Sequence, residues 1–290
     1  MSILLKSNSP LIMGVLNVTP DSFYDGGKYN DLAHALKQAE SMVADGVDII
    51  DIGGESTRPG ARGISVEEEM QRVLPVLERL TQEMVVPISV DTRHTQVMQK
   101  ALDKGASMIN DVMALQEDGA VECVASSTAA VCIMHMHGQP GTMQDNPTYH
   151  DVIDEVFQFL EKRIQVCEQK GITRDRIYVD PGFGFGKTLT HNLQLLGGLS
   201  RFKALGCPIL VGLSRKSMFG KLLKAEPQDR LFGSLAGALL SVVQGADIIR
   251  THDVKATKDV IEVFKAVQPF WQNLESIQGA GQKPGEGAYA

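Results

Sequence analysis

Short apolar runs that alternate with longer amphipathic stretches restrict the fold of this chain more than any other feature of its sequence. The runs are apolar on both faces, as β-strands covered on both sides must be, and the stretches carry apolar residues at helical spacing. The predicted strands are residues 12–16, 47–52, 88–90, 107–109, 130–134, 176–179, 209–211 and 247–249. The predicted helices are residues 32–45, 66–83, 97–104, 120–126, 152–170, 192–203, 231–243 and 257–267.

Strict alternation of strands and helices predicts one parallel sheet. Eight such units in 290 residues match the usual size of a (β/α)8 TIM barrel, so we expect an α/β fold of this kind. A weak repeat supports this prediction, because Gly46, Gly105 and Gly245 each end a helix just before a strand, where glycine supplies a left-handed cap. The alternative is an open doubly wound sheet. It would more often carry a glycine-rich dinucleotide turn after the first strand, where this chain has Asn17-Val-Thr-Pro-Asp-Ser-Phe23.

Composition and charge exclude several classes of protein. The formal charge is −7 with no Lys/Arg block, which argues against a nucleic-acid partner. No stretch approaches the roughly 18 consecutive apolar residues of a membrane span, and the N-terminus lacks the apolar core of a signal peptide. We therefore expect a cytoplasmic protein whose four cysteines are buried free thiols. Glycine, glutamine, proline and serine dominate after residue 271, so residues 1–271 are predicted as a single domain and residues 272–290 as a disordered tail.

Polar or ionisable side chains follow every predicted strand. In a TIM barrel the active site lies at these C-terminal strand ends. A single aspartate there often only caps the next helix, but eight polar ends on one face are hard to explain as caps. The set combines hydrogen-bond acceptors with cationic side chains: Asp51, Asp91, Asn110 and Asp180, with Arg58, Lys216, Arg250 and His252. It predicts a site for a ligand with a donor-rich edge at one end and an anionic group at the other.

Two shorter motifs suggest other chemistry. The run Gly182-Phe-Gly-Phe-Gly-Lys-Thr188 resembles a nucleotide-binding Walker A loop but is one residue too short. His135 and His137 share one face of a strand and could hold a metal. A hydrolase would need further histidine ligands near the later strand ends, where only His252 remains. A metal-dependent hydrolase is therefore kept as an alternative that a metal assay would test.

The motifs at the strand ends resemble, in order, those of the dihydropteroate synthases. Met13-Gly-Val-Leu-Asn-Val-Thr-Pro-Asp-Ser-Phe23 and Asp51-Ile-Gly-Gly-Glu-Ser-Thr-Arg-Pro-Gly60 are similar to the first two signatures of that family. The later motifs are Ser89-Val-Asp-Thr92, Ile109-Asn-Asp111, Met134-His-Met136, Asp180-Pro-Gly-Phe-Gly-Phe-Gly-Lys187, Gly212-Leu-Ser-Arg-Lys-Ser217 and Arg250-Thr-His-Asp253. The resemblance covers residues 10–267, with two departures: Tyr24, where a small residue is commoner, and His137, where Gln, Arg or Lys is commoner.

The resemblance implies a transferase of folate biosynthesis. In its reaction the amine of p-aminobenzoate displaces pyrophosphate from 6-hydroxymethyl-7,8-dihydropterin pyrophosphate, with Mg²⁺ assisting. It also implies a homodimer and a target for sulfonamides. By the same resemblance Asp91, Asn110, Asp180 and Lys216 hold the pterin, with Asp51 near its edge, and Asn17, Arg250 and His252 hold pyrophosphate and Mg²⁺. The p-aminobenzoate site is implied at Thr57, Arg58, Pro59, Phe185, Ser214 and Lys216, and catalysis at Lys216, Arg250 and His252.

Two related proteins remain as alternatives. A pterin-binding methyltransferase barrel shares the pterin-contacting Asp and Asn residues but would not need Thr57–Pro59, Ser214–Lys216 or Arg250–His252, all of which are present. A non-catalytic paralogue that only binds pterin should have lost some strand-end residues, and none is missing. Both comparisons favour the dihydropteroate synthases.

Overall fold

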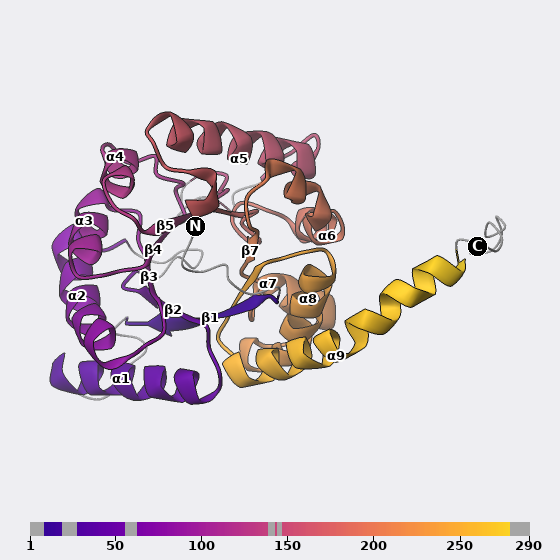
Figure 1. Cartoon of the computed structure of the whole chain (residues 1–290), viewed down its shortest axis with the longest axis horizontal. Coiled ribbons are helices and arrows are strands. Elements are labelled where there is room, and N and C mark those ends of the chain that lie inside the picture. Colours follow the sequence, from indigo (N-terminus) through magenta and orange to yellow (C-terminus); the bar gives the residue numbers. More distant parts are fainter. Residues whose placement is uncertain (1–8, 19–27, 56–62, 139–142, 144–146, 279–290) are drawn as a thin grey trace.

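A computed structural model describes residues 9–18, 28–55, 63–138, 143 and 147–278. Eight parallel strands form its centre in the order β6-β5-β4-β3-β2-β1-β8-β7 (Figure 1). A bridge between Val179 and Ile209 joins the two ends of this order, so the sheet forms a nearly closed barrel. The strands are β1 (Leu11–Asn17), β2 (Ile49–Gly53), β3 (Ile88–Asp91), β4 (Met108–Asp111), β5 (Ala130–Met134), β6 (Ile177–Asp180), β7 (Leu210–Val211) and β8 (Ile248–Thr251). The predicted TIM barrel is thereby confirmed.

Helices surround this barrel on the outside, and α9 projects away from it (Figure 1). They are α1 (Lys28–Ala44), α2 (Val66–Glu83), α3 (Thr95–Asp103), α4 (Ala120–Ala125), α5 (Val152–Gln169), α6 (Leu189–Gly197), α7 (Ser217–Leu223), α8 (Leu231–Val243) and α9 (Val254–Gln278). Short 3₁₀ helices lie at Arg174–Arg176, Leu199–Leu205 and Pro227–Asp229. Among the described residues, no helix is both long and apolar enough to cross a membrane.

Local sequence explains how a typical helix begins and which side it buries. The hydroxyl of Ser65 caps α2 by accepting a hydrogen bond from the amide of Glu68 at 3.2 Å. Three glutamates in the first turn complement the positive end of the helix dipole. Val73, Leu77 and Leu80 then recur at helical spacing and are buried against the sheet.

The predicted element boundaries are correct where the periodic pattern is strong. The predicted bounds of α2 and α8 coincide with the observed ones. The helix predicted at 192–203 is wrong as one element, because α6 ends at Gly197 and a 3₁₀ helix follows Gly198. The short helix α7 was not predicted at all. Gly46, Gly105 and Gly245 have φ angles of 84°, 93° and 97°, which confirms the left-handed caps.

The chain end differs in part from its prediction. Helix α9 continues to Gln278, past residue 272 where a disordered tail was expected to begin. Residues 279–290 lie outside the described part of the chain. The disordered tail predicted for residues 272–290 therefore stays a prediction.

The core divides into two clusters. The larger lies between strands and helices. The smaller contains strand residues that face the barrel interior: Met13, Ile49, Met108, Ala130, Cys132, Tyr178, Leu210 and Ile248. Side chains alternate along a strand, so residues two positions further on face the same interior. The smaller cluster therefore forms an apolar floor inside the barrel, and the side chains two positions later on the same strands lie directly above it.

Candidate active site

Polar side chains lie directly above the apolar floor. Asp51 follows Ile49, Asn110 follows Met108, Asp180 follows Tyr178 and Arg250 follows Ile248, each by two positions on its own strand. Register places these strand ends side by side; Asp91 pairs with Asn110, for example. Asp51, Asn110 and Asp180 are buried, although such groups are costly to bury without partners.

The guanidinium of Arg250 joins two of these carboxylates. Its Nε donates to Oδ2 of Asp51 at 2.7 Å, and its Nη2 donates to Oδ2 of Asp91 at 2.8 Å. The amide of Asn110 also donates to Oδ2 of Asp51, at 3.2 Å. Oδ1 of Asp51 is buried and has no hydrogen-bond partner within the described residues. The network thus contains one buried acceptor whose hydrogen-bonding capacity is not used within the described residues.

Burial and the opposing charges shift the protonation of this network. Burial raises the pKa of Asp91 to about 7, against the lowering effect of Arg250. Burial also raises the pKa of Asp180, which the positive charge of Lys216 opposes. Burial lowers the pKa of Lys216 to about 8, while Asp180 acts to raise it. Burial alone would lower the pKa of Arg250, but Asp51 and Asp91 outweigh it and the net shift is upward. These charges therefore interact in a poorly solvated space, where electrostatic forces are strong.

Lys216 connects the loop after β7 to the loop after β6. Its ammonium donates a hydrogen bond to the carbonyl of Phe183 and lies 4.5 Å from the centroid of the Phe185 ring. A Cβ atom on Gly184 would come within 3.2 Å of Cδ of Lys216, and Gly184 has a φ of 80°, so glycine suits this close approach. A flat aromatic ring and a cation thus lie together at the edge of the site.

Ser214 and His252 form a second contact between loops. The hydroxyl of Ser214 accepts from the backbone amide of His252 at 3.1 Å and lies 3.0 Å from Nδ1 of its ring. Beside them, Arg215 forms two hydrogen bonds with the carboxylate of Asp253, at 2.6 and 3.0 Å. The loops after β7 and β8 are therefore fixed relative to each other.

Most of the predicted site residues meet at this end of the barrel, and three cannot be assessed. Asn17 ends β1, and its Oδ1 would lie 3.7 Å from a Cβ atom added to Gly53. Thr57, Arg58 and Pro59 lie outside the described residues, as does Tyr24. His135 of the possible metal pair has its Nδ1 3.0 Å from the ammonium of Lys187. No group of three or more His, Cys, Asp or Glu suited to a metal occurs within the described ranges.

Comparison with known proteins decides which of the expected families applies. The model of the family described as pterin binding enzyme matches residues 13–252. Dihydropteroate synthase of Escherichia coli (strain K12) is 51% identical over 269 residues, which cover 93% of this chain and 95% of that protein. The chain belongs to the dihydropteroate synthase family. The same enzyme of Haemophilus influenzae is 49% identical, with 90% of this chain and 95% of that protein covered.

Solved dihydropteroate synthase structures agree with this assignment. One from Xanthomonas albilineans with 4-aminobenzoic acid has a TM-score of 0.86 and 48% identity, and covers 90% of this chain and 94% of that one. One from Yersinia pestis in a sulfonamide drug complex also has a TM-score of 0.86 and 48% identity, covering 90% and 95%. The transferase reaction expected from the sequence, which makes 7,8-dihydropteroate and pyrophosphate, is thereby confirmed.

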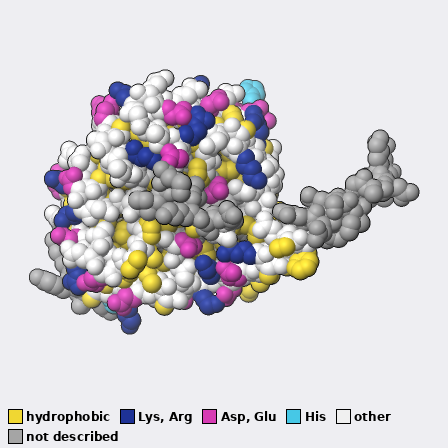
Figure 2. Space-filling view, in the orientation of Figure 1, with side chains coloured by type: hydrophobic (Ala, Val, Ile, Leu, Met, Phe, Trp, Pro, Cys, Tyr) yellow, Lys and Arg dark blue, Asp and Glu magenta, His cyan; other side chains and the backbone are white. Residues whose placement is uncertain are grey.

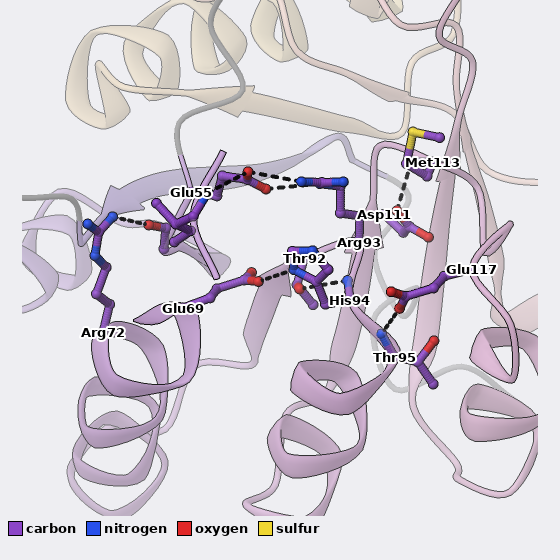
Figure 3. A network of polar contacts seen from close by, with 12 residues as sticks. Glu55, Glu69, Arg72, Thr92, Arg93, His94, Thr95, Asp111, Met113 and Glu117 are labelled. Atoms are coloured by element: carbon purple, nitrogen blue, oxygen red, sulfur yellow. Dashed lines mark hydrogen bonds and ion pairs between the residues drawn. The ribbon is translucent and has the colours of Figure 1, made fainter. Parts of the chain in front are cut away.

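Sequence reasoning missed a polar network just beyond the C-terminal ends of β2 and β3 (Figure 3). The guanidinium of Arg93 holds Glu55 through two hydrogen bonds of 3.0 and 3.1 Å. Arg72 of α2 donates to the carbonyl of Gly54 at 2.8 Å, and His94 lies 2.6 Å from a carboxylate oxygen of Glu69. Glu55 lies within the motif of residues 51–60 and Arg93 directly follows the motif of residues 89–92, so this association with the motifs was the only available signal.

Proposed function

We propose that the strand-end side chains form three adjoining subsites, for the pterin, the pyrophosphate with Mg²⁺, and p-aminobenzoate. The observation that carries this proposal is the network in which Arg250 bridges Asp51 and Asp91. It combines buried acceptors with a fixed cation in one space. A ligand with N–H donors at one end and a phosphate at the other matches that arrangement.

The pterin subsite is assigned to Asp91, Asn110, Asp180 and Lys216, with Asp51 at its edge. The amino and ring N–H groups of the pterin are donors that pair well with carboxylate acceptors. The carboxylate of Asp180 is buried, so it can serve as such an acceptor away from bulk water. Oδ1 of Asp51 offers one further acceptor. The ammonium of Lys216 supplies a donor for an acceptor atom of the ring.

The pyrophosphate subsite is assigned to Asn17, Arg250 and His252. Asn17 also fits a single protein ligand to Mg²⁺, because its side-chain oxygen stands at the end of β1 and Mg²⁺ prefers oxygen ligands while keeping several waters. When bound, Mg²⁺ would neutralise charge on the pyrophosphate. Arg250 lies on β8 and His252 directly follows the end of this strand, so both stand near the same strand end and can interact with the same anion.

The p-aminobenzoate subsite is assigned to Phe185, Ser214 and Lys216, together with Thr57, Arg58 and Pro59. The contact between Lys216 and the Phe185 ring supports this assignment, since it offers an aromatic surface beside a cation that can pair with the benzoate carboxylate. The relatives crystallised with 4-aminobenzoic acid and with a sulfonamide drug give it further support.

In this arrangement the chain acts by positioning and by electrostatic stabilisation. The amine nitrogen forms a C–N bond to the methylene carbon as the C–O bond to pyrophosphate breaks, and the amine proton leaves to solvent. An aniline nitrogen needs no strong base, so Lys216, Arg250 and His252 are assigned to orienting the substrates and stabilising the departing charge. No covalent enzyme intermediate is required.

Binding of p-aminobenzoate is expected to depend on pyrophosphate and Mg²⁺. Residues 53–63 carry Thr57, Arg58 and Pro59 together with four glycines, which increase the entropy lost when the segment orders. Pyrophosphate with Mg²⁺ can bind a cation such as Arg58 or Arg62 and so lower the cost for the next ligand. A sulfonamide should then bind about 5- to 150-fold more tightly, the usual range of coupling between sites.

Calorimetric titrations of a sulfonamide with pyrophosphate alone, Mg²⁺ alone, both and neither would measure this coupling. The protein sample should be one that forms dihydropteroate from the two substrates and Mg²⁺. Equal sulfonamide affinity in all four titrations would reject the proposed order of binding. It would leave the assignment of the chain to its family unchanged.

The chain is also proposed to form a cytoplasmic homodimer through α8 and α9. Phe232, Ala236, Leu240 and Val243 form one exposed stripe on α8, and Val263, Val267 and Phe270 form another on α9. Hydrophobic side chains gather near the base of the projecting α9 (Figure 2). An apolar patch of this kind is typical of a subunit interface. The four buried free cysteines support a reducing compartment.

Sedimentation equilibrium should accordingly give twice the chain mass of 31.5 kDa. Phe232→Asp should shift the protein toward the single-chain mass, because a charge in the interface would be buried without a partner. Val85→Asp is a matched control, since Val85 is fully exposed on the α2–β3 connection, away from α8 and α9. A monomeric wild-type protein at micromolar concentration would refute the dimer.

A further inference from the structure

Lys187 is a buried lysine that the three proposed subsites do not use. It lies between β6 and α6 and is only 3% exposed. In the sequence it is the lysine of the run that resembles a Walker A loop, and His135 belongs to the possible metal pair. The structure brings these two side chains together, with Nζ of Lys187 3.0 Å from Nδ1 of His135. Both residues therefore belong to one internal network.

Lys187 is surrounded by hydrogen-bond acceptors. Its Nζ donates to the carbonyl oxygens of Gly182 at 2.8 Å, Phe185 at 3.1 Å and His135 at 3.3 Å. Carbonyl oxygens can only accept, and only the protonated amine has three N–H bonds to donate. Burial lowers the pKa of His135 to about 2, so its ring is neutral and can also accept. The geometry therefore favours an ammonium, even though burial lowers the pKa of Lys187 and only Asp180 acts to raise it.

The network connects Lys187 to the carboxylate of Asp180 through Gly182. The amide of Gly182 donates to Oδ1 of Asp180 at 2.7 Å, while its carbonyl accepts from Lys187. Gly182 has a φ of 72°, and a Cβ atom there would lie 1.8 Å from the carbonyl oxygen of His135. Glycine is thus required where this turn passes the backbone carbonyl of His135, and the same residue contacts both charged groups through its amide and its carbonyl.

The same turn also determines where Lys216 lies. The carbonyl of Phe183 accepts from Lys216, and the Phe185 ring packs beside that ammonium. Lys187 holds the residues on either side of Phe183 through the carbonyls of Gly182 and Phe185. A displacement of this turn would therefore move Asp180 and Lys216 together.

We propose that Lys187 is a positioning residue for Asp180 and Lys216: its buried ammonium holds the turn Gly182–Phe185 and provides positive charge beside the Asp180 carboxylate. This inference rests on the proposed role of Asp180 in binding the pterin. The charged groups facing Asp180 are Lys187 from its own loop, Lys216 after β7 and Arg250 on β8. Those facing Lys187 are Asp180 and Lys216, with neutral His135 after β5. His191 on α6 also faces Lys187, and its pKa is lowered by burial and by the charge of Lys187.

Lys187→Met tests the inference, because methionine keeps much of the length of lysine but has neither charge nor N–H donors. Pterin pyrophosphate affinity should fall by roughly tenfold, as expected for a lost charge-assisted hydrogen bond. The pH below which the pterin ligand no longer binds should rise by roughly one unit, because loss of the nearby cation raises the pKa of Asp180. Lys187→Arg, which keeps the charge, should retain the wild-type pH limit. Lys100→Met on the exposed side of α3 is the matched control.

Three results would contradict the proposed positioning role of Lys187. A folded Lys187→Met variant with the wild-type pH limit, alongside Asp180→Asn that loses pterin binding, overturns this inference alone. Asp180→Asn with unchanged pterin affinity overturns both the inference and the proposed pterin subsite. If Lys187→Met does not fold, NMR of isotope-labelled lysine in the wild-type protein decides, with the resonance identified by its loss in Lys187→Arg. An ammonium at neutral pH supports the inference, and a neutral amine overturns it.

Discussion

Replacement of Asp180 by alanine is expected to weaken binding of the pterin substrate at least tenfold while leaving the barrel folded. The carboxylate is buried at the end of β6, and its Oδ1 already accepts from the amide of Gly182. A ligand N–H group that loses a desolvated ionised partner loses roughly 2–5 kcal/mol of binding free energy. Calorimetry with a pterin ligand measures this difference directly, without catalysis.

Two further variants make the Asp180 experiment specific. Asp180→Asn keeps the shape and the acceptor for Gly182 but removes the charge, so most of the loss should remain. Asp103→Ala removes an exposed carboxylate at the end of α3 and should bind the pterin as the wild-type protein does. Unchanged pterin affinity in Asp180→Ala would show that the assignment of β6 to the pterin subsite is mistaken.

Replacement of Arg250 by alanine is expected to lower both stability and turnover. Arg250 is the shared partner of Asp51 and Asp91, whose side chains are 0% and 11% exposed. Removing one partner of a buried ion pair costs about 3–5 kcal/mol, because it leaves charge without compensation. Arg79→Ala provides the matched control, since its pair with Glu83 is exposed at the surface and should contribute about 1 kcal/mol or less.

Kinetics then separate the two roles of Arg250. If the guanidinium acts mainly on charge that develops on departing pyrophosphate, kcat should fall by a larger factor than KM for the pterin substrate rises. Measurements should be made well below the unfolding temperature of the variant, so that its lower stability does not affect the rate. A rise in KM with unchanged kcat would mean that Arg250 serves only to bind the substrate in its ground state.

Some strand-end residues could be found from the sequence because their position follows from local rules. Asp51, Asn110, Asp180 and Arg250 each lie two places after an inward-facing apolar residue, and strands alternate with a period of two. Once eight strands with intervening helices are recognised, parallel pairing brings these ends to one side of the sheet. The glycine caps at Gly46, Gly105 and Gly245 were predictable for the same reason, since each depends on a single residue at a helix end.

Long-range partners could not be found in this way. Arg250 was expected at the pyrophosphate, and no local pattern indicated that it would bind Asp51, 199 positions earlier in the chain. The contact between Lys187 and His135 likewise could not be predicted from the sequence. Taken alone, Lys187 suggested a nucleotide-binding loop and His135 suggested a metal site. Such pairs depend on where whole loops meet when the barrel closes.

The sequence by itself thus determined the barrel, its eight strands, most of the helices between them, the family, and the set of polar residues at the strand ends. These features depend on periodicity, on turn-forming residues and on motifs that are continuous in the chain. Only the tertiary structure decided which charges pair, which acceptor of Asp51 is left for a ligand, and how Lys187 supports Asp180 and Lys216. The physical reason is that burial and the electrostatic environment of a side chain are set by neighbours distant in sequence, which come together only when the eight strands close around a common floor.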